Sequence, residues 1–129
     1  MRHLITVCLL IVGVIHLLPL SGVLGAERLA VLYGLPGRAF DDPNLLILMR
    51  HRAVLFGLLG GFLLLAAFRP ELQIIAFVAG FASVLSFLWL AWTGAPHNAQ
   101  ISRVVAADLV ALVCLVAGGA ARLVWQEAH

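Results

Sequence analysis

Four long apolar stretches alternate with short polar segments along this chain of 129 residues. They cover residues 4–24, 43–68, 71–92 and 101–125. Each stretch has about the 20 mostly apolar residues that a helix needs to cross a membrane. The pattern therefore predicts four membrane-spanning helices.

Residues that favour helix ends mark the second stretch. Asp41 or Asp42 suits the cap of a helix N-terminus, and Pro43 fits the first helical position. Arg69-Pro70 ends the stretch, because proline cannot continue the helical hydrogen-bond ladder. Trp89 and Trp92 close the third stretch, as indole rings do at a membrane–water interface.

The links between these stretches are short except for residues 25–42. Within that connection, residues 27–33 are too few to span a membrane, and we expect either an interfacial helical turn or a small cap over the bundle. Short links place successive helices side by side in opposite directions. We therefore expect one domain over residues 1–129, an all-α integral membrane protein built as an antiparallel four-helix transmembrane bundle.

Composition supports the membrane assignment. The chain is 64% hydrophobic and 11% charged, with a mean hydropathy of +1.11. A soluble domain is nearer half apolar and a quarter charged, and a chain this small cannot hide the excess in a core. We expect a multi-pass protein in a lipid bilayer, with the first apolar stretch retained as a helix and not removed as a signal peptide.

Charge composition narrows partners and source. The net charge of +2 and the absence of a basic run argue against nucleic acid. All eight basic side chains are Arg, as in proteins from GC-rich genomes, which indicates a bacterial source and hence the inner membrane. A membrane-protein partner or a homo-oligomer stays open.

Polar residues inside the apolar stretches form the candidate site. His16 lies in the first, Arg50-His51-Arg52 in the second and Asp108 in the fourth. Counted inward at 1.5 Å per residue, all lie roughly 6–12 Å below the same membrane surface. A charge at a helix centre costs about 2.5–3.5 kcal/mol and usually faces the bundle interior. The spacing therefore predicts one buried polar layer.

The two arginines of this layer cannot share a role. At 3.6 residues per turn, Arg50 and Arg52 point roughly 200° apart. We expect one of them to pair with Asp108 and the other to extend towards lipid headgroups. Three interpretations stay open: a structural Arg–Asp lock, a pocket for an anionic headgroup, carboxylate or quinone oxygen, and a route for protons or ions.

No other chemistry is indicated. His16 and His51 are too weak a signal for haem, and no spacing of N and S ligands suits zinc. Phosphate-binding loops, nucleophile elbows and zinc-protease motifs are missing from the sequence. We expect no catalytic residue, no metal and no cofactor, with a quinone or a lipid as the alternative ligand.

The first apolar stretch, Tyr33-Gly34, Pro43-Asn44-Leu45-Leu46 and residues 50–57 together resemble small four-helix bacterial membrane proteins similar to the DoxX-like group. The resemblance covers nearly the whole chain and implies an accessory role in quinone-linked or detoxifying membrane complexes. Look-alike sequences are sometimes labelled phosphopantetheine adenylyltransferase. That family is soluble and carries a Gly-His motif that is missing here, so the label is a misassignment.

The leading hypothesis is thus an accessory or structural membrane subunit with a buried layer of Arg, His and Asp. The alternative is a quinone- or lipid-binding redox helper that uses the layer as a pocket, and a small oligomeric transporter ranks third.

Overall fold

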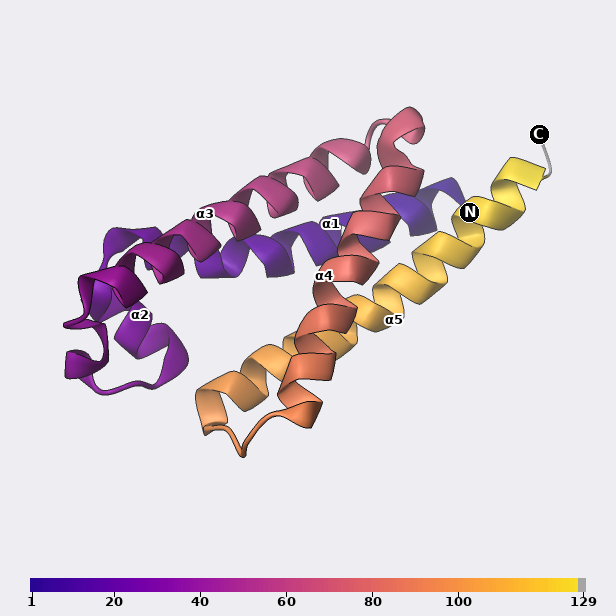
Figure 1. The fold of residues 1–129 in the computed structure, drawn as a ribbon. Helices are drawn as coiled ribbons and strands as arrows, with labels where there is room; N and C mark the ends of the chain where they lie inside the picture. The colour runs from indigo at the N-terminus through magenta and orange to yellow at the C-terminus, as the bar shows by residue number, and fades with distance from the viewer. Residues whose placement is uncertain (128–129) are drawn as a thin grey trace.

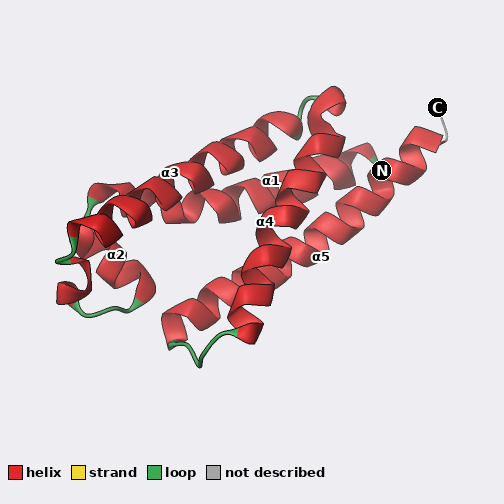
Figure 2. Ribbon diagram, in the orientation of Figure 1, coloured by secondary structure: helices red, strands yellow, loops and turns green. Residues whose placement is uncertain are grey.

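The computed structural model describes residues 1–127 of the chain. It is built from helices, with no strand in that range (Figure 2). Four helical segments are long and apolar enough to cross a membrane: Arg2–Leu24, Pro43–Ala66, Pro70–Thr93 and Ala99–Gln126. The predicted all-α class and the four apolar helices are confirmed, while residues 128–129 of the predicted domain lie outside the described range.

The helices follow one another with short links. In chain order they are α1 (Arg2–Leu17), η1 (Leu18–Leu24), α2 (Ala26–Tyr33), η2 (Gly37–Phe40), α3 (Pro43–Ala66), η3 (Pro70–Leu72), α4 (Gln73–Thr93) and α5 (Ala99–Glu127). The change from α1 to the 3₁₀ helix η1 falls beside Pro19, which has no N–H for the α-helical ladder.

The start of α3 follows the predicted capping pattern. Asp42 is the N-cap residue, and its Oδ1 accepts a hydrogen bond from the backbone N–H of Asn44 at 2.9 Å. Pro43 takes the first helical position, where its missing N–H leaves no bond unmade. The sequence signal at this helix end is therefore confirmed.

Two pairs of helices make the body of the molecule. Helix α1 lies beside α3 and runs in the opposite direction, and α4 lies beside α5 (Figure 1). Helix α1 also packs on α5, which joins the pairs through a core that includes the fully buried Leu9, Val12, Leu63 and Leu115. The pairs diverge towards the end where α3 begins, and α2 lies at that end (Figure 1).

Close packing of α1 on α3 depends on glycine. A Cβ atom at Gly60 would lie 2.9 Å from the Gly13 carbonyl oxygen and 2.9 Å from Leu17 Cγ. At Gly61 nothing lies within 4 Å. Gly57 and Gly61 have the GxxxG spacing that is common in packed membrane helices. Gly61 nevertheless makes no close contact, and Gly60 is the glycine that packs against α1.

Helix α2 is a cap held from two directions. Its Leu29 and Tyr33 form a small apolar cluster with Phe40. Gly34 ends the helix in the left-handed conformation that favours glycine, with φ 61°. From the α4–α5 turn, Asn98 Nδ2 donates to the carbonyl oxygens of Tyr33 (2.7 Å) and Gly34 (3.2 Å). The connection therefore folds as a defined helix that bridges the two diverging pairs.

Candidate functional site

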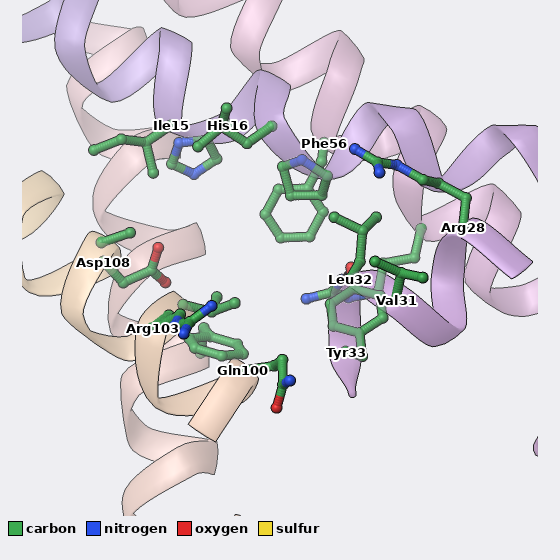
Figure 3. A pocket seen from close by; sticks show the side chains of 16 residues that line it. Ile15, His16, Arg28, Val31, Leu32, Tyr33, Phe56, Gln100, Arg103 and Asp108 are labelled. Atoms are coloured by element: carbon green, nitrogen blue, oxygen red, sulfur yellow. Dashed lines mark hydrogen bonds between the residues drawn. The ribbon is translucent and has the colours of Figure 1, made fainter. Parts of the chain in front are cut away.

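A cavity of about 420 Å³ lies beneath α2, where the two helix pairs diverge (Figure 3). Its wall comes from all five α-helices and η1, and it mixes charged, aromatic and aliphatic side chains. The lining residues are Ile15, His16, Leu18, Pro19, Arg28, Val31, Leu32, Tyr33, Arg52, Phe56, Phe87, Gln100, Arg103, Val104, Ala107 and Asp108. The structure thus brings three of the five predicted polar residues, His16, Arg52 and Asp108, to one cavity.

His16 is a buried wall residue whose two ring nitrogens are both engaged. Nδ1 lies 2.8 Å from the carbonyl oxygen of Val12, and Nε2 lies 3.0 Å from the hydroxyl of Ser83 on α4. A carbonyl only accepts, so Nδ1 carries the proton and Nε2 accepts from Ser83. A neutral ring satisfies both bonds and leaves neither nitrogen for a metal. The ring also stacks on Phe56, with centroids 5.7 Å apart.

Arg52 is fixed by its neighbours on α2 and α3. Its Nη1 donates to the hydroxyl of Tyr33 at 2.6 Å. Its guanidinium carbon lies 4.5 Å from the centroid of the Phe56 ring and 5.5 Å from that of Tyr33. A guanidinium over an aromatic face is attracted by the ring quadrupole, more strongly when it is partly desolvated. These contacts hold Arg52 at the cavity wall.

Asp108 presents its carboxylate to the cavity (Figure 3). The residue is only 8% exposed, and it makes no hydrogen bond with any residue in the range 1–127. Arg52 is the charged group that acts electrostatically on it. In the described part of the chain, the ion pair with an N–O distance below 4.0 Å is that of Arg69 and Glu71, beyond the opposite end of α3. Asp108 has no such partner there.

The expected direct pair between an arginine and Asp108 is therefore not formed. The guanidinium of Arg52 is held on the side of α2, by Tyr33, a residue of the segment that was expected to form a helical turn or a cap. Arg52 instead donates Nη1 to the Tyr33 hydroxyl and lies against the rings of Tyr33 and Phe56.

Arg50 and His51 lie outside the cavity. Arg50 is exposed, and its Nε donates to the carbonyl oxygen of Val23 in η1 at 2.9 Å. His51 is also exposed and does not line the cavity. Arg52 lines the cavity and Arg50 does not, so the five-residue layer divides into three residues that share the cavity and two that do not.

Several lining residues escaped the sequence analysis. Tyr33 and Phe56 enclose Arg52, and Arg28 and Arg103 bring further positive charge. The hydroxyl beside His16 belongs to Ser83, and the hydroxyl of Ser86, three residues further along α4, donates to the Ser83 carbonyl oxygen.

The lining residues of α5 could have been predicted from the sequence. The lining positions 100, 103, 104, 107 and 108 are spaced as one face of a helix. Extending the helix face that carries Asp108 towards the N-terminus of α5 predicts these positions. Tyr33 had no such signal, because its role depends on where α2 lies.

Within residues 1–127, no three His, Cys, Asp or Glu side chains are grouped so that they could hold a metal ion. Comparison of the chain with protein-family models, curated proteins and solved structures finds no match. What the arrangement offers chemically is a mixed cavity with fixed hydrogen-bond donors, one buried carboxylate and aromatic walls.

Proposed function

We propose that this chain is a multi-pass protein of the bacterial inner membrane, with its four long helices crossing the bilayer as an antiparallel bundle. The outer surface supports this. Leu58, Val113 and Trp92 are 66%, 68% and 86% exposed. Large contiguous apolar surface is unfavourable in water and is covered by lipid tails in a membrane.

We propose further that the protein binds a small amphiphile, of the quinone or lipid class, in the cavity beneath α2. One observation carries this proposal: Arg52 and Asp108 face the same cavity without forming an ion pair. A charged residue within a membrane helix costs about 2.5–3.5 kcal/mol, and a structural lock would offset that cost by direct pairing. The geometry therefore favours a binding site over a lock.

The dimensions and chemistry of the cavity support the same proposal. A volume of about 420 Å³ lies within the roughly 300–1,000 Å³ of small-molecule sites, which combine apolar walls with a few polar groups. Ile15, Leu32 and Phe87 supply apolar wall, and Gln100 and Arg52 supply donors. We propose no catalytic step. An accessory role in a quinone-linked membrane complex, as the DoxX-like resemblance implies, is consistent with binding alone.

The test fills the cavity without removing a polar group. Ala107 lines the cavity, whereas its neighbour Ala106 is exposed on the outer surface of α5. Wild type, Ala107→Phe and the matched control Ala106→Phe are extracted in gentle detergent, checked for helical content by circular dichroism, and analysed by native mass spectrometry.

We expect wild type and Ala106→Phe to carry a co-purifying or added amphiphile, and Ala107→Phe to have lost it while still folded. Equal binding by all three proteins would refute the site. Failure of the wild type to bind any amphiphile, whether co-purifying or added, would refute the proposed function.

A further inference from the structure

We infer that the amphiphile bound in this cavity carries an anionic head group, a carboxylate or a phosphate. This inference rests on the proposed function and names its ligand class. Three guanidinium groups, from Arg28, Arg52 and Arg103, line the cavity, against the single carboxylate of Asp108. Both ring nitrogens of His16 are engaged by the Val12 carbonyl and the Ser83 hydroxyl, and the ring is counted here as neutral. The lining therefore has two formal positive charges in excess.

Hydrogen-bond donors are also in excess. Each guanidinium has five N–H donors and no acceptor. Arg28 uses Nε on Ser21 Oγ at 3.2 Å, and Arg52 uses Nη1 on Tyr33. Arg103 makes no hydrogen bond or ion pair with a residue of the described chain. Most of these donors therefore need acceptors from outside the protein.

The side chains of Arg28 and Arg103 extend towards the cavity from α2 and α5 (Figure 3). Both residues are exposed, whereas Asp108 is buried. Arg103 and Asp108 are five residues apart on α5, which is about 7.5 Å along the helix axis. An anionic head group can thus lie between Arg28 and Arg103 at the rim of the cavity, away from Asp108. The negative charge of Asp108 repels the head group and so favours this position at the rim.

Guanidinium groups suit this ligand class for a geometric reason. Their planar fork binds carboxylate and phosphate through paired, charge-assisted hydrogen bonds, which are stronger than bonds between neutral groups. A neutral quinone or alcohol would accept one or two bonds and would leave the positive charge uncompensated.

The experiment compares ligands that share a tail and differ in the head. Binding of oleate, oleyl alcohol and decylubiquinone is titrated by native mass spectrometry at one detergent concentration. The proteins are wild type, Arg103→Gln, Asp108→Asn and Arg50→Gln. Arg50→Gln is the matched control, because it removes the same charge from α3 outside the cavity. Inorganic phosphate is added alone and in competition with oleate.

Wild type and Arg50→Gln should bind oleate roughly 10- to 100-fold more tightly than either neutral amphiphile. Arg103→Gln should lose most of that preference, and Asp108→Asn should bind oleate at least as tightly as wild type. Phosphate alone should not displace oleate, because it lacks the tail that the apolar wall binds.

Each contrary result has one meaning. Equal affinity for all three amphiphiles, or an oleate preference unchanged in Arg103→Gln, would overturn the anionic head while the binding function stands. Loss of oleate from Asp108→Asn would show that the carboxylate contacts the ligand, which contradicts the proposed orientation. Displacement by phosphate would make a free anion the ligand. If no amphiphile binds, the proposed function itself fails.

Discussion

Alanine at two neighbouring glycines of α3 should have opposite effects on stability. At Gly60 the added Cβ would meet the Gly13 carbonyl oxygen and Leu17 Cγ, each at 2.9 Å. The carbonyl belongs to the backbone of α1, so it cannot move aside without shifting the helix. At Gly61 the Cβ would meet nothing within 4 Å.

The magnitude follows from two terms. Replacing Gly by Ala inside a helix stabilises it by about 0.8–1.0 kcal/mol, and both variants share this gain. Overpacking a tight contact costs typically about 1–3 kcal/mol, and only Gly60→Ala has this cost. Because the shared gain cancels, Gly60→Ala should be less stable than Gly61→Ala by about 1–3 kcal/mol.

The assay is reversible unfolding of detergent-solubilised protein by increasing mole fractions of sodium dodecyl sulfate, followed by circular dichroism. The two variants differ only in the position of one methyl group, so they control for each other. If Gly61→Ala proved as destabilised as Gly60→Ala, the contact between α1 and α3 described here would be wrong, and the Gly57/Gly61 spacing would mark the packed face.

Three further predictions concern the site and its cap. Tyr33→Phe removes the hydroxyl that Arg52 donates to, so it should destabilise the protein by about 1.5–3 kcal/mol in the same unfolding assay; a change below about 0.5 kcal/mol would contradict the bond. Ser83→Ala leaves Nε2 of buried His16 without a donor and should cost about 1–3 kcal/mol, whereas an unchanged midpoint would mean that the ring bonds elsewhere. Asn98→Ala removes two hydrogen bonds that hold the end of α2, so hydrogen exchange should accelerate in residues 26–33 and not in α1; uniform exchange in both would refute the role of Asn98.

The sequence predicted the long helices because their signals are local. Apolar length predicted the four long helices, and Asp42 with Pro43 marked the start of α3 as the structure has it. Counting depth along the helices also placed His16, Arg52 and Asp108 near one level, and these three line the same cavity. Each of these inferences needs only the rise of a helix and the thickness of a membrane.

The contacts that the sequence did not predict depend on how each helix is rotated about its axis and on which segment covers it. Gly57 and Gly61 have the spacing typical of packed membrane helices, yet the rotation of α3 against α1 brings Gly60, and not Gly61, to the contact. Arg52 bonds to Tyr33 of α2, a helix whose end is held by Asn98 of a distant turn, and makes no ion pair with Asp108 in the described chain. No local pattern encodes these contacts, since they join residues 19 and 65 positions apart.

The central claim, that the cavity beneath α2 holds an amphiphile with an anionic head, is tested most directly by photolabelling. A fatty acid carrying a diazirine is irradiated with the protein in gentle detergent, and labelled residues are identified by peptide mass spectrometry. We predict labels on lining residues such as Phe56, Phe87 and Val104, lost when excess oleate competes and retained with excess oleyl alcohol. Labels confined to outward residues such as Leu58 and Val113, unchanged by either competitor, would contradict the account.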